Sequence, residues 1–273
     1  APLLAYRRRH SAHYAAREAS RMPLLQRDGA EIHYDVYGEG YPLILFAPGG
    51  MHSVAEMWRQ RPGAPGQRMP WIDPTAELSD RFQVVAMDQR NAGRSSAPIS
   101  ATDGWATFTA DHLALIDHLG FPQVHVMGGC IGSSYCLGLC QAAPDRVTAA
   151  VLQNPIGLSA DNRDTFFEMF DSWSTEMQAR RHDIDEDALQ AFRQSMFGGD
   201  FVFSATRDFV GTCPVPLLVL AGNDEFHPTA VAQEIAELAP DAELVLEWTS
   251  PTHHEATLAR VRLFLGAHTP APT

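Results

Sequence analysis

The chain has 273 residues, of which 45% are hydrophobic and 19% are charged, as is typical of a soluble globular protein with a substantial core. Its formal net charge of −13 argues against a nucleic-acid partner, and no apolar run reaches the ~18 residues that a membrane-spanning helix needs. All 20 basic residues are arginine, so chemistry that depends on a lysine amine is excluded. We expect a cytoplasmic protein without a membrane or nucleic-acid partner.

Residues 1–21 differ in composition from the rest of the chain. They contain five arginines and one acidic residue, Glu18. An arginine-rich, acid-poor stretch is typical of a targeting segment. We favour the alternative that it is upstream sequence, from a misplaced start or an addition made for expression, and that it is flexible. Residues 22–273 hold 15 basic and 32 acidic residues, a net charge of −17, and are predicted to form one domain.

Short apolar runs alternate with longer helical patterns from residue 29 onward. An uninterrupted apolar run is typical of a strand covered on both faces. Strands are predicted over residues 30–38, 42–50, 82–90, 124–129, 149–155, 216–224 and 242–248. Helices are predicted over residues 107–120, 131–146, 229–240 and 255–268. This alternation predicts an α/β fold with a mostly parallel central sheet and helices on both faces.

Residues 158–214 interrupt the alternation. They contain helical patterns but no buried-type strand, and an insertion of this size between core strands usually forms a small helical cap. Phe166, Phe167, Phe170 and Trp173 are candidates for a hydrophobic substrate pocket. They are equally good candidates for the core of the cap itself.

The strongest local motif is GGCIG at residues 128–132, with Cys130 at its centre. It follows a predicted strand and precedes a predicted helix, which is the context of a nucleophile elbow with cysteine in place of serine. Gly128 and Gly132 lack the bulk that would keep strand and helix apart in such a strained turn. The helix amino terminus favours the thiolate form of the side chain.

Four segments together resemble the α/β-hydrolase family over most of residues 29–266. Residues 42–50 are similar to the strand that leads to the family's oxyanion loop, and the elbow follows at Cys130. Residues 87–98 resemble its D-x-R-G-x-G-x-S turn, with Asn91 in place of the first glycine. Asp224 and the loop at residues 250–254 come in the order nucleophile, acid, histidine that the family requires.

The resemblance implies a Cys-His-Asp triad. Cys130 is the expected nucleophile, and Asp224 the expected acid that orients the histidine. Glu225 is a rival for the acid, and a helix cap is the alternative role for Asp224. His253 and His254 compete as the base, and we favour His253 because it precedes the final helix.

Other polar residues near these motifs receive simpler interpretations. His227 could line the pocket, but we expect it to be structural. Asp88 and Arg90 are expected to hold their turn together. The resemblance implies an oxyanion hole made by the backbone amide of Ile131 and by that of Gly50 or Met51.

The four cysteines match no zinc-binding spacing and do not suggest a disulfide framework, so we interpret them as thiols. Cys136 and Cys140 are expected to pack against the sheet. We predict no cofactor and no metal site.

A cysteine nucleophile in this fold resembles that of dienelactone hydrolases and of polyhydroxyalkanoate synthases. The chain is short for a polyester synthase, so we favour a hydrolase of a small ester, lactone or related carbonyl compound. The alternatives are an acyltransferase that uses the same triad and a non-catalytic ligand-binding protein. The expected partner is a small-molecule substrate. The sequence leaves open whether the chain self-associates and whether Cys130 is native or replaces a serine.

Overall fold

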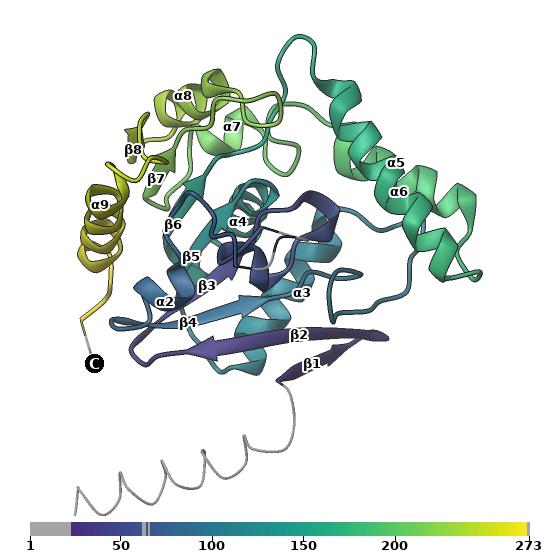
Figure 1. Ribbon diagram of the computed structural model, residues 1–273, viewed down its shortest axis with the longest axis horizontal. Helices are drawn as coiled ribbons and strands as arrows, with labels where there is room; N and C mark the ends of the chain where they lie inside the picture. Colours follow the sequence, from purple (N-terminus) through teal and green to yellow (C-terminus); the bar gives the residue numbers. More distant parts are fainter. Residues whose placement is uncertain (1–22, 62–63, 65, 272–273) are drawn as a thin grey trace, which may run out of the picture.

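The structure, a computed structural model, describes residues 23–61, 64 and 66–271. The predictions made for residues 1–21 therefore lie outside the described residues. The described residues form an eight-stranded, mostly parallel sheet flanked by helices (Figure 1), as the sequence predicts.

The strand order in the sheet is β1-β2-β4-β3-β5-β6-β7-β8. The first two neighbouring pairs, β1 with β2 and β2 with β4, are antiparallel, and all other pairs are parallel. The strands are β1 (Leu24–Arg27), β2 (Ala30–Tyr37), β3 (Tyr41–Phe46), β4 (Phe82–Met87), β5 (Val124–Gly129), β6 (Val147–Gln153), β7 (Leu217–Leu220) and β8 (Ala242–Val245). The short edge strand β1 was not predicted, because its four residues carry no clear alternation.

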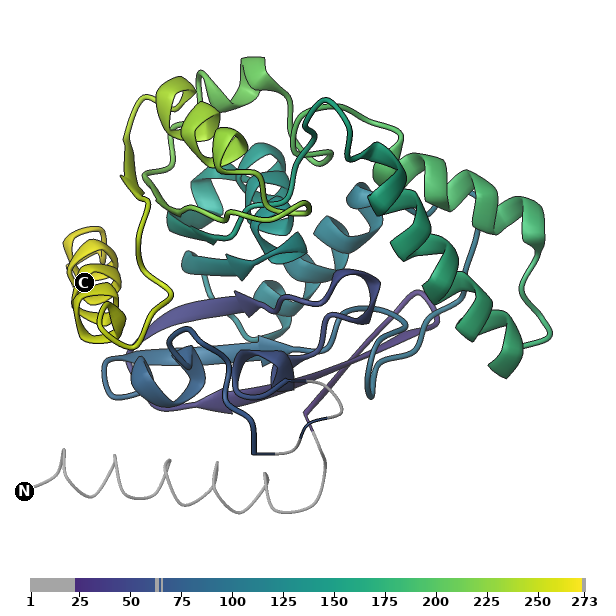
Figure 2. The same cartoon turned by 45° about the horizontal axis from the view of Figure 1, so that its top comes forward.

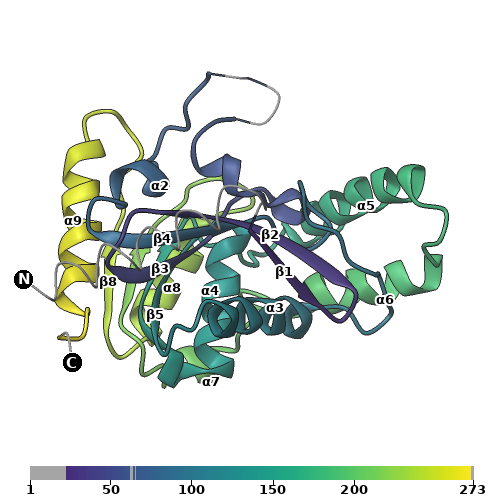
Figure 3. The same ribbon diagram turned by 90° about the horizontal axis from the view of Figure 1, so that it is seen from below.

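The helices cover both faces of the sheet. One face packs against α3 (Trp105–His118), α4 (Ile131–Ala142) and α8 (Thr229–Leu238). The other face packs against α2 (Pro74–Glu77) and α9 (His254–Ala267). Figure 3 shows α3 and α2 on opposite sides of the strands. Three short 3₁₀ helices, η1 (Gly50–His52), η2 (Ala55–Trp58) and η3 (Pro144–Arg146), lie in the connections.

Alternating strand residues explain this two-sided core. In β3, Ile44 and Phe46 join the cluster under α3 and α4, whereas Leu43 and Leu45 join the cluster under α9. All four side chains are fully buried. The continuous apolar strands of the sequence are therefore strands with a hydrophobic core on each side.

The connection between β6 and β7 contains α5 (Arg163–Arg180), α6 (Glu186–Phe197) and the single-turn α7 (Arg207–Val210). Figures 1 and 2 show α5 and α6 side by side at the opposite end of the molecule from α9. Phe170 and Trp173 of α5 are buried against Phe192 of α6. Their aromatic side chains therefore form the core of this helical pair.

Among the helices that the structure describes, none has the length and apolar character required to cross a bilayer.

Candidate active site

Cys130 lies at the junction between β5 and α4, in a backbone conformation that L-residues rarely adopt. Its φ is 56° and its ψ is −121°. Its N–H donates to the carbonyl of Gln153 at 2.9 Å, and its own carbonyl accepts from the N–H of Ser133 at 3.0 Å. These two bonds hold the turn from both sides, as expected for a strained residue at a functional site. Cys130 is half-buried as a whole residue.

The glycines on either side of the elbow are required by close backbone contacts. A Cβ on Gly128 would lie 2.0 Å from the carbonyl oxygen of Gly132. A Cβ on Gly132 would lie 2.0 Å from the carbonyl oxygen of Phe46 on β3. Both contacts involve backbone atoms that have no rotamer to change, so the strand and helix can approach only where these side chains are absent.

His227 is the histidine that faces Cys130. It belongs to the loop between β7 and α8, and its Nδ1 lies 2.7 Å from Oδ1 of Asp224. The same carboxylate oxygen accepts from the N–H of Phe226 at 3.0 Å and of His227 at 3.1 Å. Asp224 therefore both closes the turn at residues 224–227 and orients the imidazole of His227. Gly222 makes this turn feasible, because a Cβ there would lie 2.3 Å from the Cβ of His227.

The charges of the site favour a thiolate–imidazolium pair. Burial opposes ionisation of Cys130, but the charge of His227 and hydrogen bonds from His227, Gly49 and Ile131 outweigh it and lower the pKa of the thiol. Burial also lowers the pKa of His227, yet the charges of and hydrogen bonds to Cys130 and Asp224 raise it to about 9. At neutral pH His227 is therefore an imidazolium, and its charge favours the thiolate form of Cys130.

The contact between the ring and the sulfur is mainly a charge interaction. Nε2 of His227 is buried, and the charge of the ring lowers the pKa of the thiol more than its hydrogen bond to the sulfur does. Because Nδ1 is held by Asp224, Nε2 is the nitrogen left to exchange a proton with a group at Cys130.

Two backbone amides approach the sulfur, those of Ile131 and Gly49. Ile131 opens α4 and was the first predicted oxyanion donor. The second amide at the sulfur is that of Gly49, which precedes the expected oxyanion donors Gly50 and Met51 in the chain. These two residues are buried in η1 and do not line the cavity around Cys130, whereas Gly49 does. Gly49 has a φ of 118°, which reverses the chain just before η1.

The structure does not bring His253 or His254 to Cys130. His253 caps the start of α9, and its Nδ1 lies 3.0 Å from the hydroxyl of Ser250. His254 points to Glu77 on the far face of the sheet, with Nε2 2.7 Å from Oε1. The expected partnership of Cys130 with His253 is therefore absent from the geometry.

The loop after β7 brings the expected acid to a histidine other than the expected one. Asp224 contacts the imidazole, whereas its rival Glu225 accepts from the hydroxyl of Thr165. His227, expected to be structural, lies at the site. The spacing Asp224-x-x-His227 after Gly222 is the signal that could have found it, because such a spacing fits one turn closed on the acid.

Cys130, Asp224 and His227 line one cavity of about 580 Å³. The carboxyl ends of β3, β5 and β6 supply the floor, which also contains Gly49 and Gln153. Met57 of η2 and the described part of the segment that leads to α2 supply the wall, with the lining residues Arg61, Gln67, Arg68, Met69, Pro70 and Trp71. The volume lies within the range of about 300–1,000 Å³ that is usual for small-molecule sites.

The aromatic residues of the cap do not line this cavity. Phe166, Phe170 and Trp173 are about 1% exposed and stack among themselves and against Phe192 and Phe197. Of the two interpretations of these residues, the structure favours the core of the cap.

The turn at residues 87–98 is a scaffold for the site. Oδ1 of Asp88 accepts from the N–H of Ala55, and its Oδ2 accepts from the backbone and side chain of Arg94. Arg90 is paired with Asp111 at 2.8 Å. Asp88 and Arg90 therefore hold the turn, as predicted, and Asn91 adopts the expected positive φ of 59°.

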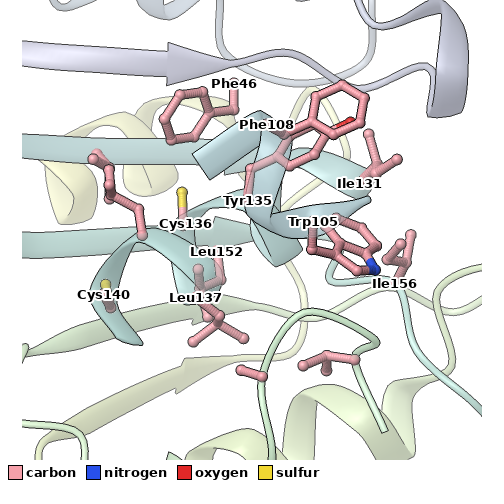
Figure 4. Packing of buried hydrophobic residues seen from close by; sticks show 14 of the residues in the cluster. Phe46, Trp105, Phe108, Ile131, Tyr135, Cys136, Leu137, Cys140, Leu152 and Ile156 are labelled. Atoms are coloured by element: carbon pink, nitrogen blue, oxygen red, sulfur yellow. The ribbon is translucent and has the colours of Figure 1, made fainter. Parts of the chain in front are cut away.

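Cys130 differs from the other three cysteines in exposure. Cys136, Cys140 and Cys213 are at most 1% exposed, and Figure 4 shows Cys136 and Cys140 among the apolar side chains of α4 and the sheet. Packing is therefore the function of these two thiols, as expected.

The α/β hydrolase fold model matches residues 42–216. The chain belongs to this family. The match begins at the strand before Gly49 and includes the elbow at Cys130, but it ends before the loop that carries Asp224 and His227.

Individual relatives are distant. The chain is 31% identical over 107 residues to a soluble epoxide hydrolase from Corynebacterium sp. strain C12, covering 39% of this chain and 32% of that protein. The matched part of this chain spans less than half the length of the first curated relatives.

Solved structures share the fold over nearly the whole chain. A hydrolase from Pseudomonas aeruginosa PA01 superposes with a TM-score of 0.66 at 22% identity, covering 91% of this chain and all of that one. An enol-lactonase from Burkholderia xenovorans LB400 superposes with a TM-score of 0.65 at 21% identity, covering 89% of this chain and all of that one. At these identities the likeness extends to the fold alone.

Proposed function

We propose that the protein hydrolyses a small ester, thioester or lactone through a covalent intermediate on Cys130. The observation that carries the proposal is the arrangement of Cys130, His227 and Asp224 around one cavity, with the imidazole held between sulfur and carboxylate. His227 takes the role of the base for which His253 was the expected candidate.

The acylation step uses the charges that the site already favours. The thiolate of Cys130 attacks the carbonyl carbon, a C–S bond forms, and the π electrons move to the carbonyl oxygen. The amides of Ile131 and Gly49 are positioned to stabilise that oxyanion, and one such donor is worth about 3–4 kcal/mol. When the oxyanion collapses, the leaving oxygen or sulfur departs with the bonding electrons and takes the proton from Nε2 of His227.

Deacylation reverses the role of the imidazole. Neutral His227 removes a proton from water, which attacks the thioester carbonyl. The C–S bond then breaks, the acid leaves, and Cys130 is again a thiolate beside an imidazolium. Asp224 stays bonded to Nδ1 throughout and stabilises the cation.

Family membership supports the proposal without specifying the substrate. A soluble epoxide hydrolase and an enol-lactonase, both similar to this chain, differ in the bonds that they cleave, so the reaction follows from the site rather than from the fold. A thiolate nucleophile favours activated esters, lactones and thioesters.

The proposal is tested by intact-mass analysis after exposure to 4-nitrophenyl esters, lactones and thioesters. We expect one acyl group per chain on the wild type and none on Cys130→Ala. Because the other cysteines are buried, the native protein should also take up a single iodoacetamide group, at Cys130. Full turnover by Cys130→Ala would contradict the proposal.

The same experiment separates hydrolysis from acyl transfer. The thioester can pass its acyl group to an alcohol, amine or thiol as well as to water. Added acceptors should leave the yield of free acid unchanged if water is the natural acceptor. Diversion of most product to an acceptor would instead establish acyl transfer. No acyl adduct from any compound would favour a ligand-binding protein.

A further inference from the structure

Two arginines that pair with no carboxylate of the described residues line the cavity that contains Cys130. Arg61 and Arg68 are both exposed and both belong to its wall. Backbone contacts bring the two residues near each other. The N–H of Arg61 donates to the carbonyl of Gln67 at 3.0 Å, and Gln60 pairs with Arg68 in an antiparallel bridge. Arg61 and Arg68 therefore lie on two antiparallel stretches of backbone that both border this cavity.

These two side chains are exceptions in the described part of the chain. Arg163 donates to the carbonyls of Phe197 and Gly199, and every remaining described arginine except Arg61 and Arg68 lies within 4.0 Å of a carboxylate. In a protein of net charge −13, carboxylates are abundant, yet none within the described ranges neutralises this pair.

The charges lining the cavity leave the two arginines available for a ligand. Asp224 is the only carboxylate among the described lining residues, and it is engaged by His227. A thiolate at Cys130 is likewise paired with the imidazolium. Arg61 and Arg68 therefore give the cavity a positive charge that its other described lining residues do not balance.

We propose that the substrate of Cys130 carries an anionic group, a carboxylate or phosphate, which Arg61 and Arg68 bind while the scissile carbonyl lies over the thiol. This inference rests on the proposed function and specifies its substrate class. A cavity of about 580 Å³ is within the size range of small-molecule sites, and Cys130 and both arginines line it. The planar guanidinium fork suits the two oxygens of such an anion.

The anion can lie on either side of the scissile bond. On the acyl side, the substrate is a monoester or monothioester of a dicarboxylic acid. On the leaving-group side, it is an acyl group attached to an anionic alcohol or thiol. The two sources share the same recognition chemistry, and matched substrate pairs distinguish them.

The experiment measures kcat/KM for two pairs of substrates that differ in charge. The acyl-side pair is 4-nitrophenyl monoadipate and its methyl ester. The leaving-group pair is acetyl coenzyme A and S-acetyl-N-acetylcysteamine. We expect wild-type protein to prefer the anionic member of one pair by about tenfold or more, mainly through KM, and less so in 0.5 M NaCl because salt screens exposed charges.

The variants are Arg61→Gln, Arg68→Gln and the double substitution. Each single change should reduce the preference by about threefold to fivefold, as expected for exposed charge pairs. The double variant should abolish the preference by lowering kcat/KM for the anionic member to that for the neutral one. Arg180→Gln is the matched control, since Arg180 is 74% exposed and does not line this cavity.

The outcomes separate the two proposals. Acylation of Cys130 by neutral and anionic members at equal rates, or a preference that survives the double substitution, overturns the anionic substrate class and leaves the proposed function intact. No acylation by any member overturns both.

Discussion

Exchanging His227 for glutamine should remove the charge that keeps the Cys130 thiol ionised. In that variant burial is the largest remaining influence on the thiol, so its pKa should rise. A thiol with a pKa of about 8.5 is only about 3% ionised at pH 7. Alkylation of Cys130 at pH 7 should therefore slow by about tenfold or more and recover as the pH rises.

Catalysis should fall further than alkylation, because the leaving group also loses its proton donor. A positioned general acid contributes about 10²- to 10⁴-fold. In the wild type, ester cleavage should decline as the pH rises through about 9, the pKa of His227, since the imidazole then lacks the proton it must give.

His253→Gln provides the matched control. His253 is 40% exposed, contacts Ser250 and does not line the cavity, so its loss should change both rates by less than about twofold. Iodoacetamide labelling followed by mass spectrometry, and single-turnover release of 4-nitrophenol, measure the two rates for each variant. If His253→Gln were inactive and His227→Gln fully active, the assignment of the base from the structure would be refuted.

Three further predictions concern the elbow, the acid and the buried histidines. Gly132→Ala should lower the free energy of unfolding by at least about 2 kcal/mol, whereas Gly266→Ala, whose Cβ meets nothing within 4 Å on α9, should raise it by about 0.5–1 kcal/mol in urea titrations. Asp224→Asn should lower the pKa of His227 from about 9, seen by NMR titration of the ring, and reduce kcat/KM at least about tenfold; an unchanged pKa would contradict the contact. Burial lowers the pKa of His112 to about 3 and that of His125 to about 4, so folded protein binds fewer protons than unfolded protein below pH 6.5. The free energy of unfolding should therefore fall by about 4 kcal/mol from pH 7 to pH 5, and His125→Gln should remove about half of that fall.

Local sequence determined the scaffold and the position of the proposed nucleophile. Uninterrupted apolar runs such as residues 42–46 identify strands buried on both faces, because only such strands have no solvent side to leave polar. The glycines around Cys130 identify the elbow because the contacts that require them, Gly128 with Gly132 and Gly132 with Phe46, arise from a short stretch of chain and its neighbouring strand.

Tertiary structure decided which histidine faces the thiol and what walls the cavity. His253 and His227 both follow strands near the carboxyl end of the sheet, and their order in the chain does not distinguish them. The difference lies in the paths of two loops: Asp224 and Gly222 fold His227 inward, while Ser250 and Glu247 engage His253 elsewhere.

The same reason applies to the cap and the substrate wall. The aromatic side chains of α5 stack on α6 and do not line the cavity, whose lining instead includes Arg61 and Arg68. Periodicity reports which face of a helix is apolar but not which partner covers it. Strand positions and turns follow from neighbouring residues, whereas the juxtaposition of distant loops depends on the packing of the whole fold.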